Sequence, residues 1–441
     1  MNKQTLIISK YVFIFEQDGT YLLFNIKKDS FMELTEDLYE KLITMQKTGK
    51  SSLLEDKDIV DKLTESGILT TKLEDQSFLD EIILKHNRQF YSKDTMDLTI
   101  LPTITCNLKC PYCYETSKPK GVISKKTCDK IIEFIKKRIK HEPRLNLGWS
   151  GGEPLLGIDK MEYLLNSIKE NGIKLLSHSI VTNATLLKGK ALDVFEKFPL
   201  DDIQVTFDGI QERHDKLRIH HNDKGTFDEI LKNLDEFVVR FPKTDINIRV
   251  NIGTHNSEDF IVLKEFFHKR YPENKNIIVY PGILAGGKGY GYNSHFFSSN
   301  QLSDFHTSLL NKNKKVELPS HECKGCVANY LNGFVIGPKG ELYKCWEDAG
   351  KKEREIGSII DGYFSNYTLY QQYMLHGSFI DDKRCLDCGL LPICEGGCSF
   401  KRIENKFEGK RNNLCDHYKL KNGQSLKKLL YLCYQQQTQL D

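Results

Sequence analysis

The sequence predicts an α/β protein with a central, mostly parallel sheet between an N-terminal module and a cysteine-rich C-terminal region. From about residue 96 to residue 300, short β-branched runs alternate with amphipathic helix patterns, which is typical of βαβ units. The first 75 residues instead predict strands followed by helices. Eight of the 13 cysteines gather between about residues 320 and 415.

The first 75 residues predict a small winged-helix-like α+β module. Asp18-Gly19 is a turn signal between two runs rich in aromatic and β-branched residues, so it predicts a hairpin. Thr35 can cap one helix, and Gly67 can end another. The expected strands are 10–16, 21–26 and 31–34, and the expected helices begin after Thr35 and cover 56–66. Residues 76–95 predict a linker helix.

The middle of the chain predicts about six βα units in a barrel-like sheet, although its length also allows eight. Chemistry in such barrels takes place at the carboxyl ends of the strands. The first strand is followed closely by Cys106, which places this residue at that end. The expected strands are 98–101, 145–149, 179–182, 203–207, 246–252 and 277–280.

Cys106, Cys110 and Cys113 have C-x-x-x-C-x-x-C spacing, which lets one loop turn three thiolates toward one point. Three thiolates on a four-iron cluster leave one iron without a protein ligand, and an open metal position can bind a substrate or cofactor. A structural zinc site is the alternative, but such sites usually combine paired C-x-x-C units and four ligands.

This cysteine triple resembles the motif of the radical S-adenosylmethionine (radical SAM) enzymes, including the aromatic Tyr112 before the third cysteine. The resemblance implies a partial (β/α)6 barrel over residues 96–310. It also implies a [4Fe-4S] cluster on the three cysteines, whose open iron chelates SAM. One electron from the cluster would cleave SAM to a 5′-deoxyadenosyl radical.

Gly151-Gly152-Glu153 follows the second expected strand. Glycines allow close backbone approach, and a carboxylate accepts hydrogen bonds from an ammonium group. The segment resembles the family motif that binds the SAM amino group. Thr206-Phe207-Asp208-Gly209 resembles a family Ser-Leu-Asp-Gly segment. The resemblance implies further SAM contacts at Tyr112 and, with ordinary turn chemistry as the alternative, at Thr206, Arg218 and Asn251.

The C-terminal cysteines divide into two sets of four, which suits two four-iron clusters or two zinc ions. Their spacing, with Gly340 in a G-x4-C segment, resembles the SPASM domain and implies two auxiliary clusters in residues 311–441. The close spacing of Cys323 and Cys326 departs from relatives and leaves Cys323 in doubt as a ligand. The implied sets are Cys323, Cys326, Cys345 and Cys398, and Cys385, Cys388, Cys394 and Cys415.

Composition limits the function further. The formal net charge is only +3, so composition gives no argument for nucleic-acid binding. No apolar run approaches the roughly 20 residues of a membrane span, and the N-terminus does not resemble a signal peptide. We therefore expect a cytoplasmic protein without a membrane partner, whose clustered cysteines bind metal rather than form disulfides.

The N-terminal module resembles PqqD-type peptide-recognition domains, which bind a leader peptide as an added strand at a sheet edge. Together the resemblances imply a maturase of a ribosomally made precursor peptide. It would form a thioether or carbon–carbon crosslink with three [4Fe-4S] clusters, SAM and an electron donor such as flavodoxin or ferredoxin. The alternatives are a sulfatase-maturase-like formylglycine-generating enzyme and a non-catalytic iron–sulfur or zinc scaffold.

Glu347 and Asp348 are candidates for a catalytic base. They follow Cys345, and a carboxylate beside a cluster can take the proton that leaves the substrate. Related sulfatase maturases carry an aspartate directly after the equivalent cysteine, where this chain has Trp346. Solvated acids in a turn are the alternative interpretation.

Overall fold

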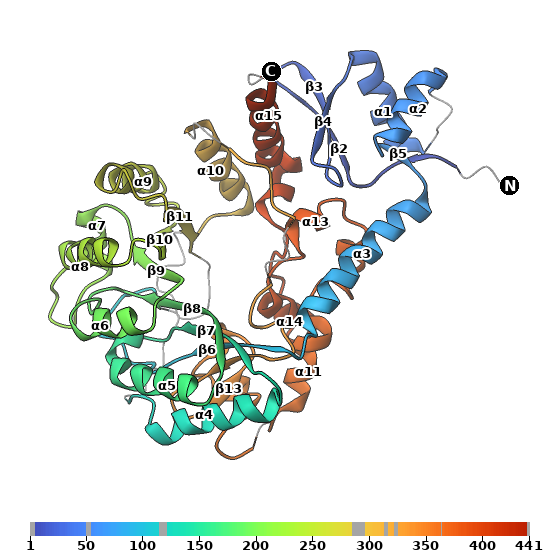
Figure 1. The fold of residues 1–441 in the computed structure, drawn as a ribbon. Coiled ribbons are helices and arrows are strands. Elements are labelled where there is room, and N and C mark those ends of the chain that lie inside the picture. Colours follow the sequence, from blue (N-terminus) through green and yellow to red (C-terminus); the bar gives the residue numbers. More distant parts are fainter. Residues whose placement is uncertain are drawn as a thin grey trace. The chain divides into compact units, whose positions relative to one another are not determined.

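The structure is a computed structural model that describes residues 5–49, 54–113, 121–284, 296–312, 316–321, 325–362 and 364–438 (Figure 1). The chain forms two compact units. Unit 1 contains residues 1–90, 298–325 and 375–441, and unit 2 contains residues 91–297 and 326–374. The region 311–441, which the sequence predicts as one domain, therefore contributes residues to both units.

Six parallel strands, β6 to β11, lie in chain order at the centre of unit 2. This confirms the predicted α/β class, and all six predicted strands are present. Buried and more exposed residues alternate along β6 and β7, as period-two strands require. The elements are β6 (Thr95–Ile100), α4 (Lys125–Arg138), β7 (Arg144–Trp149), η2 (Pro154–Gly157), α5 (Ile158–Glu170), β8 (Lys174–Thr182), α6 (Lys190–Lys197), β9 (Asp202–Phe207), α7 (Gln211–Leu217), α8 (Phe227–Arg240), β10 (Asp245–Ile252), α9 (Asp259–Arg270) and β11 (Ile277–Ile283).

Part of the cysteine-rich region extends this sheet. β12 pairs parallel with β6, and β13 and β14 continue antiparallel beyond it. Gly340 forms the β12–β13 turn with φ +88°, where a Cβ would lie 2.9 Å from an Ile359 side-chain atom. The glycine of the G-x4-C segment is thus explained by a tight turn. The elements are β12 (Gly333–Ile336), β13 (Glu341–Tyr343), η4 (Trp346–Asp348), η5 (Lys352–Arg354), β14 (Gly357–Ser358) and α11 (Tyr367–His376).

The N-terminal part of unit 1 has the predicted order of three strands and two helices. Asp18 and Gly19 both have positive φ in the β2–β3 turn, as expected for a type I′ hairpin. The Thr35 side chain accepts a hydrogen bond from Leu38 N and caps the first helix. The elements are β1 (Ile7–Ile8), β2 (Val12–Gln17), β3 (Thr20–Asn25), β4 (Ser30–Glu33), α1 (Glu36–Thr48), α2 (Lys57–Glu65), β5 (Leu69–Thr70) and α3 (Lys72–Phe90).

The β2–β4 sheet buries both of its faces. One face packs Val12, Ile14 and Leu23 against α1 and α2. The other packs against Leu426 and Leu430 of the C-terminal helix α15, and each such fully buried leucine stabilises by about 1.5–3 kcal/mol. The remaining elements are α10 (Ser299–Lys312), α12 (Lys383–Leu386), α13 (Leu391–Cys394), α14 (Ser399–Phe407), η6 (His417–Gly423) and α15 (Gln424–Thr438).

The predicted linker helix is α3, and it is not a free linker. Leu79 packs with Phe379 and Leu391 of the C-terminal region in one apolar cluster. The N-terminal module and the end of the chain are therefore joined by two apolar contacts within unit 1, one through α3 and one through α15.

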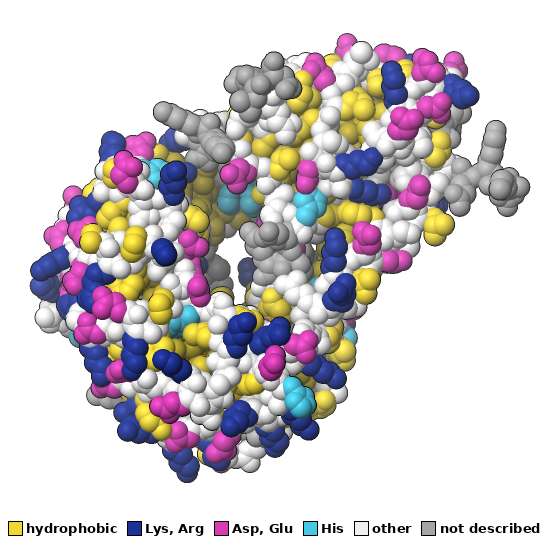
Figure 2. All heavy atoms as spheres, in the orientation of Figure 1, with side chains coloured by type: hydrophobic (Ala, Val, Ile, Leu, Met, Phe, Trp, Pro, Cys, Tyr) yellow, Lys and Arg dark blue, Asp and Glu magenta, His cyan; other side chains and the backbone are white. Residues whose placement is uncertain are grey.

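The surface carries charges of both signs. On the face drawn in Figure 2, basic and acidic side chains are interspersed, in agreement with the formal net charge of +3. Within the described part of the chain, no helix has the length and apolar character that a membrane crossing requires.

Candidate active site

The cysteine loop leaves the carboxyl end of β6. The Cys106 sulfur accepts a hydrogen bond from Leu108 N at 3.4 Å, and Asn183 Nδ2 lies 3.8 Å away at the end of β8. N–H groups directed at a sulfur favour its thiolate form, which is the form that ligates metal. The surroundings of Cys106 therefore fit the predicted role of this residue as a cluster ligand.

Gly151 and Gly152 let the second strand end approach this loop. A Cβ on Gly151 would lie 2.2 Å from Thr103 O, and one on Gly152 would lie 2.3 Å from Thr105 O. Gly152 N donates to Thr103 O at 3.1 Å, and Glu153 N donates to Thr105 O at 3.0 Å. The glycines are needed here because backbone packs on backbone immediately before Cys106.

The Glu153 side chain is fully buried beneath the loop. Its carboxylate accepts hydrogen bonds from Thr182 Oγ1 at 2.7 Å, Asn183 N at 2.8 Å and Leu155 N at 3.1 Å. Burial raises the pKa of Glu153, while these donors act in the opposite direction. Glu153 thus joins the ends of β7 and β8, and its predicted contact with the SAM amino group stays a prediction.

Tyr112, which precedes the third cysteine, lies at the centre of a buried polar network. Its hydroxyl donates to Asp208 and accepts from Arg218 Nη1 at 3.0 Å. Asn251 Nδ2 lies 3.5 Å from the same hydroxyl. Burial raises the pKa of Asp208, and the positive charge of Arg218 opposes this. Three predicted SAM-contact residues, Tyr112, Arg218 and Asn251, are therefore brought together by the fold.

Two buried atoms of this network, Asp208 Oδ1 and Arg218 Nε, have no hydrogen-bond partner in the described structure. Unpaired polar groups in a protein interior are costly, so this pair marks a place that suits a polar ligand. Thr206, at the end of β9, is also buried. The residues present fit the expected binding of SAM beside the cysteine loop.

A set of contacts that clamps the cysteine loop was not predicted from the sequence. Lys109 N donates to Ile219 O at 2.9 Å, and the Lys109 ammonium forms an ion pair with Asp223 at 2.6 Å. His221 Nε2 donates to Cys106 O at 3.2 Å. Asp208 was also missed as a binding residue, although its place in Thr206-Phe207-Asp208-Gly209 was the available signal.

The C-terminal cysteines are described except for Cys323, which lies outside the described residues. Cys326 and Cys345 belong to unit 2, whereas the remaining described members belong to unit 1. In the second set, the Cys385 sulfur accepts a hydrogen bond from Arg402 at 3.0 Å, and Lys419 Nζ lies 3.8 Å from the Cys388 sulfur. Positive groups beside sulfurs fit cysteines that ligate metal as thiolates.

No three His, Cys, Asp or Glu side chains of the described chain converge as a site for a single metal ion. A cubic four-iron cluster binds one cysteine per iron, so its ligand sulfurs stand farther apart than those around one ion. None of the cysteines that the structure describes takes part in a disulfide. The described thiols therefore form neither disulfides nor a compact single-ion site.

The predicted base candidates differ in their surroundings. Asp348 is fully buried, accepts a hydrogen bond from the Tyr373 hydroxyl at 2.7 Å and lies 3.5 Å from Arg354 Nε. Glu347 is only partly buried. The Asp348 contacts are those of a residue that holds η4 against α11, and the base role stays a prediction for both carboxylates.

A family model described as the radical SAM superfamily matches residues 100–267, which run from the last residue of β6 into α9 and include the cysteine loop. The serine-type anaerobic sulfatase-maturating enzyme of Bacteroides thetaiotaomicron is 30% identical over 358 residues, covering 71% of this chain and 85% of the relative. The chain belongs to the radical SAM superfamily, and it is an enzyme of that class.

Two further proteins are similar over nearly the whole chain. The radical SAM cyclopropyl synthase TigE of Paramaledivibacter caminithermalis is 23% identical and covers 95% of both chains. The crystal structure of Streptococcus suis SuiB bound to the precursor peptide SuiA has a TM-score of 0.53 at 19% identity. It covers 93% of this chain and 100% of SuiB.

Proposed function

We propose that this enzyme modifies a ribosomally made precursor peptide. Cys106, Cys110 and Cys113 would hold one [4Fe-4S] cluster, and the two C-terminal cysteine sets would hold two more. With SAM bound, the first cluster supplies a 5′-deoxyadenosyl radical that abstracts hydrogen from a peptide residue. The bond that results would be a thioether or a carbon–carbon crosslink.

The observation that carries this proposal is the extent of the similarity. A match over 95% of 441 residues leaves about 22 residues unmatched, so the similarity to TigE includes most of the N-terminal module. SuiB, solved with a precursor peptide, also covers 93% of the chain. The sulfatase-maturating relative covers only 71%. The module is thus part of what this chain has in common with TigE and SuiB.

The N-terminal module supports peptide binding by strand addition. β2 and β4 are the outer strands of the three-stranded sheet, and an extended peptide can add to such an edge through backbone hydrogen bonds. Both faces of the sheet are already covered by apolar contacts, so its edges are the places where a leader would bind. We assign leader recognition to this module, which resembles the PqqD type.

The residues around the cysteine loop would position the reactants. Arg218 and Asp208 offer a cation and a carboxylate with unused hydrogen-bonding atoms beside Tyr112, which suits the charged and hydroxyl groups of SAM. Glu153 and the clamp at Ile219 fix the loop from two sides. The burial of Glu153, Asp208 and Arg218 would keep water away from a radical reaction.

Formylglycine formation is the second candidate, because a sulfatase-maturating relative has the higher identity, 30%. This reaction would use the same SAM site on a cysteine or serine of a sulfatase. In either case a small reductant protein such as flavodoxin or ferredoxin would supply the electron, and we expect the reaction to take place in the cytoplasm.

The test compares two substrates with anaerobically reconstituted full-length enzyme, SAM and dithionite. One is a precursor-peptide candidate selected from the reading frames that flank this gene, and the other is a sulfatase peptide with its target cysteine or serine. The proposal predicts a loss of two hydrogens from the encoded peptide, measured by mass spectrometry, and an unchanged sulfatase peptide. Conversion of the sulfatase peptide alone would reverse this assignment.

A further inference from the structure

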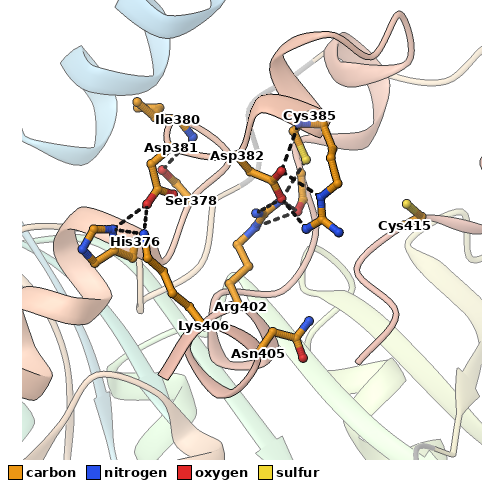
Figure 3. A network of polar contacts seen from close by, with 12 residues as sticks. His376, Ser378, Ile380, Asp381, Asp382, Cys385, Arg402, Asn405, Lys406 and Cys415 are labelled. Carbon is orange, nitrogen blue, oxygen red and sulfur yellow. Dashed lines mark hydrogen bonds and ion pairs between the residues drawn. The ribbon is translucent and has the colours of Figure 1, made fainter. Parts of the chain in front are cut away.

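A buried arginine stands among the cysteines of the second C-terminal set. Arg402, on α14, is only 5% exposed. Figure 3 shows its guanidinium directed at Asp382 and Cys385, with Nη2 3.0 Å from the Cys385 sulfur and Nη1 3.0 Å from Asp382 Oδ2. Nε donates to Gly396 O at 2.9 Å, and Nη2 donates to the same carbonyl. One side chain thus binds a thiol, a carboxylate and a backbone carbonyl.

These partners connect the segments that carry the cysteines. The Asp382 side chain caps α12 by accepting from Arg384 N, and Cys385 lies on that helix. Gly396 lies between Cys394 and Cys398. The Asp382 carboxylate forms ion pairs with Arg402 at 3.0 Å and with Arg384 at 2.9 Å, so it compensates the buried guanidinium. The guanidinium therefore holds the Cys385 helix against the Cys394 loop.

The charge of Arg402 also acts on the sulfur. Its Nη2 donates to the Cys385 sulfur at 3.0 Å, so one positive charge is in contact with this sulfur. Hydrogen bonds to cluster sulfurs and the net charge nearby set the reduction potential of iron–sulfur clusters. A buried cation that donates to a ligand sulfur favours the more negative, reduced state of the cluster, so it raises the potential.

We propose that Arg402 is a positioning residue that orients Cys385 as a thiolate ligand and raises the reduction potential of the auxiliary cluster on Cys385, Cys388, Cys394 and Cys415. This inference rests on the proposed function, because it requires that cluster. It identifies this auxiliary cluster as one tuned to accept an electron.

The chain supplies a matched control. Arg384 binds the same Asp382 carboxylate through Nε at 3.0 Å and Nη2 at 2.9 Å, but its side chain is 80% exposed. Solvent screens an exposed charge, so Arg384 should act far less on the cluster than Arg402 does. Arg402→Met and Arg384→Met each remove one positive charge that pairs with the Asp382 carboxylate.

The experiment is a redox titration of the full chain carrying Cys106→Ala, Cys110→Ala and Cys113→Ala, so that only auxiliary clusters report. Arg402→Met should keep its iron and make reduction of one cluster at least tenfold less favourable, a midpoint shift of about −59 mV for one electron. Arg384→Met should leave the midpoint unchanged, and Arg402→Lys should fall between the two.

An unchanged midpoint in Arg402→Met with full iron content would overturn the inference. If Arg402→Met loses about four irons, which is one cluster, the titration of Arg402→Lys takes its place. A lowered midpoint potential in Arg402→Lys supports the inference, and an unchanged midpoint potential overturns it. If Cys385→Ala removes no iron from the parent, the auxiliary cluster itself is wrong, and this inference is wrong with it. The iron content thus separates the two failures.

Discussion

The cysteine loop after β6 and the cysteine segment 385–415 are both proposed to bind an iron–sulfur cluster, but different structural elements hold them in place. The first lies at the carboxyl edge of a long parallel sheet and is fixed by buried protein contacts such as Tyr112 to Asp208. The second lies on α12 and α13, which have four residues each, and on loops between them. Helices so short do not persist alone in water. We therefore expect the sheet site to form without metal, and we expect the order of segment 385–415 to depend more strongly on a bound cluster.

The largest expected effect is on SAM cleavage, which should depend on the cysteine loop after β6. Replacing Cys106, Cys110 and Cys113 with alanine should abolish SAM cleavage and remove about four irons, one cluster. The circular dichroism spectrum should stay that of the parent, because the loop is fixed by backbone contacts to Thr103 and Thr105. Residual 5′-deoxyadenosine production in this variant would contradict the assignment of the loop.

Iron removal should then distinguish the two sites by how much ordered structure each one keeps. In chelated protein we expect amides of 383–415 to exchange hydrogen at least tenfold faster than in reconstituted protein, equal to about 1.4 kcal/mol. Amides of β6 to β11 should keep their rates. Hydrogen-exchange mass spectrometry measures both regions in one sample, and equal protection of 383–415 with and without iron would break the comparison.

Tyr112→Phe tests whether protein contacts fix the sheet site. The change leaves Asp208 and Arg218 without their shared hydroxyl, so it should lower the free energy of unfolding by about 1–3 kcal/mol and weaken SAM binding. Tyr163→Phe is the matched control, because its hydroxyl donates to Asp129 at 2.8 Å on the surface. Its effect should stay within about 0.5 kcal/mol in urea unfolding.

The smallest expected effects concern the carboxylates after Cys345. Asp348→Asn should lower the free energy of unfolding by about 1–3 kcal/mol through the contacts to Tyr373 and Arg354. Glu347→Gln should change it by less than about 0.5 kcal/mol. A catalytic base would instead show lost product, continued SAM cleavage and parental stability, with 5′-deoxyadenosine and product measured separately.

Local patterns explain what was predictable from sequence. Strand periodicity, the Asp18-Gly19 turn and the Thr35 cap act within a few residues, so they indicated the strands and helices correctly. The cysteine spacing predicted the loop site, and the role of its three cysteines stays a prediction. The pairing of β12 with β6 was not predicted, because it joins segments more than two hundred residues apart and no local period encodes it.

The same reason limits the prediction of the sites. Arg218 and Tyr112 were both expected to contact SAM. The hydrogen bond between them joins two residues that are 106 positions apart in the sequence, so it depends on the fold. The local sequence around Asp208 indicates a turn, and the local sequence around Arg402 indicates a basic helix. Only tertiary packing shows that both are buried beside residues of the cysteine motifs.

The central claim is that this enzyme abstracts a hydrogen atom from a peptide, and the most direct test traces that hydrogen atom with deuterium. The precursor-peptide candidate selected from the flanking reading frames would be made with deuterated residues and incubated anaerobically with the reconstituted enzyme, unlabelled SAM and dithionite. We predict that 5′-deoxyadenosine gains deuterium in step with peptide modification, as measured by mass spectrometry. Unlabelled 5′-deoxyadenosine together with a modified, fully deuterated peptide would contradict hydrogen abstraction from the peptide by this enzyme.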